Sequence, residues 1–226
     1  MLRVSDHRDD PIRVLTVLAR LNVAFHAAGL ALAVVALRAG TALVPLSERM
    51  AFLAGKPLLW RLGWGVWMIS ALLLVAYLAS AERLVQQRWE RSLLARLSVT
   101  FAAAGMGVDL LCEVINLSVL PLLASSGTSE LFLAFERMAF TGGATVANGL
   151  YTTAVLLLTR ALGARASALT RASGYGAVVS GYLMAVAGIL PSPVLLQYAT
   201  GPTIGFYCLW VLVVVTDLRT SGEPRP

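Results

Sequence analysis

Long apolar stretches recur along the chain, and they constrain its fold more than any other feature. A helix needs about 20 apolar residues to cross the hydrocarbon core of a bilayer. Only 13% of the 226 residues are charged, whereas soluble domains contain about 25%. The sequence therefore predicts an all-α, polytopic membrane protein with six transmembrane helices in one bundle. The predicted spans are Leu15–Leu37, Leu62–Ser80, Leu97–Leu120, Met138–Leu158, Gly174–Leu190 and Leu195–Leu218.

Arginine and lysine are unevenly divided between the two sides of this predicted bundle. The two tails and the second and fourth loops hold twelve of them, and the loops of the other side hold five. Positively charged loops stay in the cytoplasm, so both termini are predicted to be cytoplasmic. The chain then divides into an N-terminal tail (1–14), a transmembrane domain (15–218) and a C-terminal tail (219–226). The basic residues serve topology in this interpretation, and we expect no nucleic-acid partner.

Ionisable residues inside a span are costly, so they are the strongest functional signals here. Asp109, Glu113 and Asn116 follow one another at i, i+4 and i+7 and lie within about 60° of each other on a helix. Lipid would not solvate this face, so it must point into the bundle. Two carboxylates one turn apart do not both ionise readily in a low dielectric, and we expect at least one to hold a proton. The pattern predicts a proton site, a cation site or the polar end of a ligand pocket, with a buried structural network as the alternative.

The first span repeats this arrangement with Asn22 and His26 on one face. Both spans run in the same direction, and His26 lies about as many residues into its span as Asp109 does, so their depths match within about one turn. From depth alone, the sequence predicts that these two side chains are neighbours near the middle of the membrane.

Further polar residues accompany the fourth and fifth spans. Asn148 shares a helix face with several threonines, and the fifth span carries glycines at seven-residue spacing (Gly174, Gly181 and Gly188). Small residues of this kind let membrane helices approach closely, so helix packing is the favoured interpretation. Arg137 begins the fourth span. We expect a simple interfacial pair with Glu136, the alternative being that Arg137 neutralises Glu113.

The first loop contains a predicted short helix at Ser47–Leu53 and leads into three tryptophans, Trp60, Trp64 and Trp67. An aromatic belt at the outer membrane surface is the simple interpretation of these tryptophans. A functional group of tryptophans is the alternative.

Motifs that would identify an enzyme or a cofactor site are missing from the sequence. It contains no phosphate-binding loop, zinc-protease motif or serine-nucleophile motif. The chain has only two cysteines, which form no CxxC motif, and only two histidines, and this composition argues against metal and haem sites. We therefore predict no cofactor and no metal site.

Short motifs carry a resemblance to a known group. Trp60-Arg61-Leu62-Gly63, Asn116-Leu117 and the glycine-rich fifth span resemble uncharacterised bacterial six-helix membrane proteins that share a domain of unknown function. The resemblance implies six helices and a bacterial cytoplasmic (inner) membrane, and it brings no activity, cofactor or catalytic residue.

Three functions fit these observations. The first is a small transporter or ion-coupled carrier that uses Asp109 and Glu113, with a pocket completed by His26, Asn22, Asn116 and Asn148. The second is a non-catalytic sensor or interaction module that binds a lipid, a pigment, a hydrophobic ligand or a partner membrane subunit. The third is an intramembrane lipid-modifying enzyme. The lipid bilayer is the predicted partner in all three, with an oligomer of this chain or a partner subunit left open.

Overall fold

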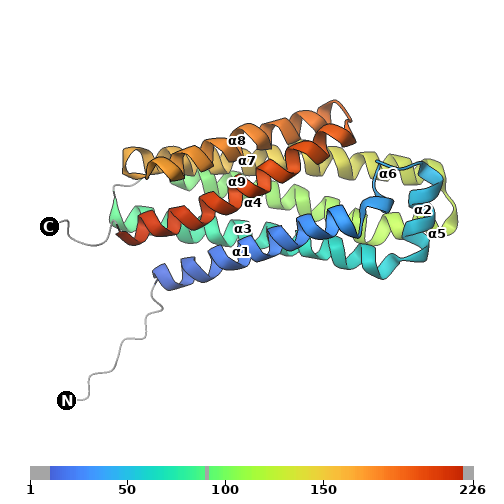
Figure 1. Cartoon of the computed structure of the whole chain (residues 1–226), viewed down its shortest axis with the longest axis horizontal. Coiled ribbons are helices and arrows are strands. Elements are labelled where there is room, and N and C mark those ends of the chain that lie inside the picture. The colour runs from blue at the N-terminus through green and yellow to red at the C-terminus, as the bar shows by residue number, and fades with distance from the viewer. Residues whose placement is uncertain (1–10, 90–91, 221–226) are drawn as a thin grey trace, which may run out of the picture.

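The computed structural model describes residues 11–89 and 92–220, which are almost entirely helical (Figure 1). Residues 1–10 and 221–226 of the predicted tails lie outside the described residues. The helices in chain order are α1 (Pro11–Val35), η1 (Arg38–Gly40), α2 (Leu46–Gly55), α3 (Pro57–Arg88), α4 (Leu93–Val114), η2 (Ile115–Val119), α5 (Leu120–Ser126), α6 (Ser129–Thr141), η3 (Gly142–Ala147), α7 (Asn148–Leu162), η4 (Gly163–Arg165), α8 (Ala168–Ile189) and α9 (Pro193–Thr220).

The described helices form six rods that are arranged in a closed ring. Helices α4 and α5 continue into one another through the π-helical segment η2, and α6 and α7 do the same through the π-helical segment η3. Each rod packs against the next one in the chain, from α1 through α3, α4, α7 and α8 to α9, and α9 closes the ring on α1. Helix α1 begins and α9 ends at the same end of the bundle (Figure 1).

Among the described residues, five helical segments are long and apolar enough to cross a membrane. They are Pro11–Val35, Pro57–Arg88, Leu93–Ser126, Ala168–Ile189 and Pro193–Thr220. The α6–α7 rod contains the predicted span Met138–Leu158, but its glycines, threonines and Asn148 make it less apolar than the other five. These five segments support a multi-pass membrane protein in a lipid bilayer. Helices extend beyond the predicted apolar stretches because polar residues at their ends continue the same hydrogen-bonded turns.

The half of the bundle where α1 begins is filled by side chains, and we call it the packed half. Its largest fully buried side chains include Trp210, Tyr77, Leu158 and Leu218. The Tyr77 hydroxyl donates to the Val211 carbonyl at 3.0 Å, and its ring meets Trp210 edge-on at 6.1 Å. These contacts tie α3 to α9 across the middle of the ring.

Helices α7 and α8 approach closely because glycines of one helix face threonines of the other. A Cβ atom added at Gly174, Gly181 or Gly188 would overlap the Oγ1 atom of a threonine on the facing rod. The threonines are Thr159, Thr152 and Thr145 respectively, which repeat at the same seven-residue spacing in the opposite direction. The predicted packing role of the glycines is therefore confirmed.

A second, smaller apolar cluster caps the opposite end of the bundle. The expected short helix at Ser47–Leu53 is present as α2, which packs against α5. Leu53, Trp60 and Phe132 are buried there together with Leu37 and Leu120. A cavity lies between this cap and the packed half. We call this part of the bundle the open half.

Candidate functional site

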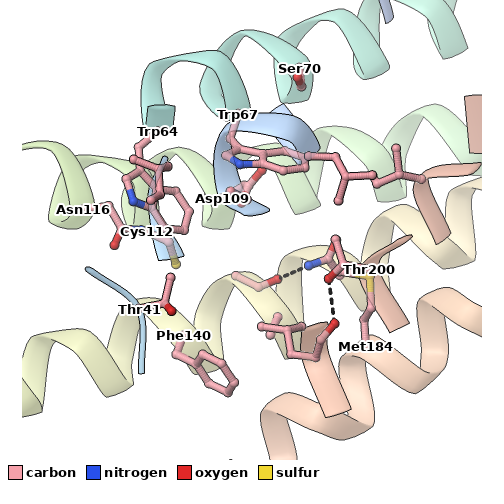
Figure 2. A pocket seen from close by; sticks show the side chains of 18 of the residues that line it. Thr41, Trp64, Trp67, Ser70, Asp109, Cys112, Asn116, Phe140, Met184 and Thr200 are labelled. Atoms are coloured by element: carbon pink, nitrogen blue, oxygen red, sulfur yellow. Dashed lines mark hydrogen bonds between the residues drawn. The ribbon is translucent and has the colours of Figure 1, made fainter. Parts of the chain in front are cut away.

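A cavity of about 360 Å³ occupies the open half. Its walls come from α1, α3, α4, the α6–α7 rod, α8 and α9, so every rod of the ring contributes to it. Figure 2 shows Trp64 and Trp67 of α3 on one side, Phe140 and Met184 on the other, and Asp109 and Cys112 of α4 near the tryptophans. Most of the lining is apolar, and a small number of polar groups interrupt it. This composition is typical of a binding site for a small organic ligand.

The two acids of α4 line this cavity, as the amphipathic pattern predicts. Glu113 is 3% exposed, and the Tyr151 hydroxyl donates to Asp109 Oδ2 at 3.2 Å. Within the described part of the chain, Glu113 Oε2 is buried and has no hydrogen-bond partner. An unpaired polar group in a protein interior is costly, so a ligand that supplies its partner would stabilise the site.

Asn116 also lines the cavity, and it lies in the π-helical segment η2. There the Leu120 amide donates to the Ile115 carbonyl, which leaves the Asn116 carbonyl free to accept from Trp60 Nε1 at 2.8 Å. Arg61 Nε donates to the next carbonyl, Leu117, at 3.0 Å.

Proline accounts for the second free carbonyl. Pro121 has no amide hydrogen to donate to the Leu117 carbonyl four residues earlier. That carbonyl is consequently available to Arg61, and the helix is locally widened beside the acids. Segments of this kind often occur at functional sites.

A second π-helical segment, η3, faces α4 from the α6–α7 rod. Asn148 lines the cavity at the end of η3, and its Nδ2 donates to the Gly143 carbonyl at 2.9 Å. Gly142 lies so close to Cys112 that any added Cβ would overlap the sulfur atom. Two widened helices thus meet beside the acids.

His26 and Asn22 have different environments, although the sequence places them on one helix face. His26 lines the cavity, with its Nδ1 2.9 Å from the Asn22 carbonyl and its ring 4.9 Å from that of Tyr207. Asn22 is fully buried: its amide group donates to the Leu18 and Leu73 carbonyls, and its Oδ1 accepts from Tyr207 at 2.9 Å. Asn22 is therefore a structural link between α1, α3 and α9.

His26 and Asp109 line the same cavity, as their matching depths in the two spans predict. Their described partners are different, since His26 contacts α1 and the aromatic rings of α3 and α9, while Asp109 is bonded to α7.

The tryptophans do not form the expected aromatic belt. Trp60 is 2% exposed, and all three tryptophans line the cavity. Trp64 Nε1 is buried without a hydrogen-bond partner among the described residues. The spacing of Trp60, Trp64 and Trp67 at i, i+4 and i+7 was the signal for this role, because it places them on one helix face.

Arg137 lies apart from the acids. Its side chain is exposed, and it is not among the cavity-lining residues. Glu136 pairs with Arg49 of α2 at 2.7 Å, in place of the expected pair with Arg137. Arg49 also donates to the Val44 carbonyl at 2.9 Å, so this ion pair fastens the cap to α6. Sequence reasoning missed Arg49 because 87 residues separate it from its partner.

The cavity offers aromatic surface, the carboxyl groups of Asp109, Glu113 and the ion-paired Glu136, and amide and hydroxyl groups. Among the described residues, no group of three or more His, Cys, Asp or Glu side chains is placed to hold a metal ion. The arrangement is suited to holding an organic molecule or a proton.

Comparison with protein-family models, with curated proteins and with solved structures found no match to this chain. The resemblance to bacterial six-helix membrane proteins stays a prediction. The functional conclusion depends on the cavity itself.

Proposed function

We propose that the protein is a six-span membrane protein that binds an amphipathic ligand in the cavity of the open half. The α6–α7 rod is less apolar than the other five rods, but it packs in the same ring with them. This position supports a sixth membrane span. Arg83, Arg160 and Arg219 belong to the end of the bundle where α1 begins, which supports cytoplasmic termini. A bacterial inner membrane is the location that the sequence favours.

The observation that carries the proposal is the pairing of an apolar cavity with unpartnered polar atoms. Glu113 and Trp64 both line the cavity, and each has a buried polar atom without a partner in the described structure. A ligand whose polar end donates to the carboxyl group and accepts from the indole N–H would satisfy both. Its apolar body would lie against Trp67, Phe140 and Met184.

The pattern of buried residues along α1 and α9 supports entry of a ligand into the cavity from the bilayer. In α9, the residues from Tyr207 to Leu218 are repeatedly buried, whereas Ala199 is the one buried residue of the preceding part. In α1, burial ends at Gly29. The cavity reaches exposed side chains on both helices, Val34 and Gln197. The cap covers the end of the bundle, so the side between α1 and α9 is the favoured route for a lipid-soluble molecule.

Thermal unfolding with simple amphiphiles tests this proposal. 1-Dodecanol should stabilise the detergent-purified protein more than dodecanoate does, because its hydroxyl can donate to Glu113 and accept from the Trp64 N–H, whereas a carboxylate has no hydrogen to donate. A ligand at 100 times its Kd adds about 2.7 kcal/mol. Glu113→Gln and Trp64→Phe should each reduce the response, and the exposed Glu48→Gln should not. Equal stabilisation of all variants would contradict a site at Glu113.

An ion-coupled carrier is the second candidate, and the presence of both Asp109 and Glu113 on one cavity wall favours it. Proteoliposome uptake that depends on a proton or cation gradient, and that Asp109→Asn and Glu113→Gln both abolish, would support this function. Such transport also requires the packed half to open, because its side chains block the passage beyond Tyr207. Ligand binding without uptake would contradict the carrier function and support a binding protein.

A further inference from the structure

A second pocket at the opposite end of the bundle is lined by four arginines. They are Arg13 and Arg20 of α1, Arg88 of α3 and Arg219 of α9. The other described lining residues are Ile12, Thr16 and Val17, so no carboxylate of the described residues lines the pocket. Four cations that share one pocket repel each other unless an anion enters.

The guanidinium group of Arg88 lacks a hydrogen-bond acceptor within the described structure. Its Nη1 atom is buried and has no hydrogen-bond partner among the described residues. A guanidinium group presents several donors in a planar fork that matches the oxygens of a phosphate. A phosphate group in this pocket would provide the missing acceptor and offset the repulsion.

The surroundings of the pocket favour a lipid over a soluble anion. Arg13 and Arg20 are seven residues apart on α1, which separates them by about 10 Å along the helix axis. Between and beside them, Val14, Val17 and Leu21 are 40%, 49% and 39% exposed. Side chains of this kind face lipid in a membrane-spanning helix, and a charged residue among them is costly without an anionic partner.

We propose that this arginine pocket binds the phosphate of an anionic phospholipid in the adjacent leaflet. Basic pockets between helices at the cytoplasmic side are suited to such headgroups. In the proposed orientation the leaflet is the cytoplasmic one. The site is separate from the cavity at Glu113 and does not depend on its ligand.

Thermal unfolding in nanodiscs tests the proposal. Nanodiscs of phosphatidylcholine alone are compared with nanodiscs that also contain phosphatidylglycerol, for the full chain and for Arg20→Gln/Arg88→Gln. We expect phosphatidylglycerol to stabilise the wild type, and each lost arginine to weaken binding about fivefold. The matched control, Arg83→Gln/Arg160→Gln, removes the same charge at the same end but outside the pocket, and it should keep the response.

Three outcomes would overturn the proposal. One is an equal response of both double variants, which would indicate general attraction to a charged surface. Another is full stabilisation by inorganic phosphate in phosphatidylcholine nanodiscs, which would indicate a soluble ligand. The last is the absence of any effect of phosphatidylglycerol on the wild type. If the Gln variant does not fold, Arg20→Lys/Arg88→Lys keeps the charge without the planar fork and should show an intermediate response.

Discussion

The packed half and the open half are built from the same six rods but differ in what fills the ring. In the packed half, Trp210 and Tyr77 occupy the centre and are essentially inaccessible. In the open half, Trp64 and Trp67 stand at the edge of a cavity. Both halves contain buried polar atoms that have no hydrogen-bond partner in the described part of the chain, for example at Thr159 and at Glu113. Of these two residues, only Glu113 lines the cavity.

The difference lies in the helices as well as in the side chains. The α7–α8 contact keeps a strict seven-residue register of glycine and threonine. In the open half this register continues to Thr145 in η3, while the π-helical segments η2 and η3 interrupt the α-helical hydrogen bonding of the α4–α5 and α6–α7 rods beside the cavity. Regular packing therefore provides a rigid base, and local irregularity leaves space for a ligand.

Replacing a large side chain in each half should produce the largest contrast. Trp210→Ala should lower the free energy of unfolding by about 3–5 kcal/mol, because it leaves a void in a filled core. Trp64→Ala should cost less than about 1.5 kcal/mol, since its ring already borders a cavity. Denaturant unfolding in micelles measures both values. Similar losses for the two variants would break the distinction between the halves.

A single methyl group tests the packing register. Gly181→Ala should cost about 1–3 kcal/mol, because the new Cβ would overlap Thr152. Gly107→Ala, with nothing within 4 Å of its added Cβ, is the matched control and should be neutral.

A double-mutant cycle sharpens this prediction. Thr152→Ala removes the overlapping hydroxyl, so it should recover most of the loss caused by Gly181→Ala. Additive losses in the double variant would show that another contact is responsible.

Buried polar residues should respond according to their hydrogen bonds. Asn22→Ala should cost roughly 1–2 kcal/mol, since it leaves the Tyr207 hydroxyl and the Leu73 carbonyl without this partner. Glu113→Gln should leave stability unchanged or slightly increased, because Glu113 Oε2 has no hydrogen-bond partner among the described residues to lose. A large destabilisation by Glu113→Gln would instead indicate a structural network.

Much of this fold can be predicted from the sequence, because residues that face lipid must be apolar. The periodic spacing of polar residues therefore indicates which helix face points into the bundle. Each predicted span overlaps one rod, and five of these rods are long and apolar enough to cross a membrane. The face with Asp109, Glu113 and Asn116 points to the cavity as expected.

Other features depend on contacts between distant segments, which periodicity does not encode. The Arg49–Glu136 pair and the Tyr207–Asn22 bond join residues far apart in the chain. The role of the tryptophans depends on which way α3 rotates in the ring. The π-helical segment η2 has one local signal, Pro121, which removes a single hydrogen-bond donor.

Thiol labelling of two matched serines tests the central claim most directly. Ser70 and Ser98 are both buried, and each hydroxyl bonds to a carbonyl of its own helix, but only Ser70 lines the cavity. Each is changed to cysteine in a Cys112→Ala/Cys208→Ala background and exposed to aminoethyl methanethiosulfonate. We predict that the Ser70→Cys protein reacts while folded and that the Ser98→Cys protein reacts only after denaturation. Equal protection of both positions would contradict an accessible cavity in the open half.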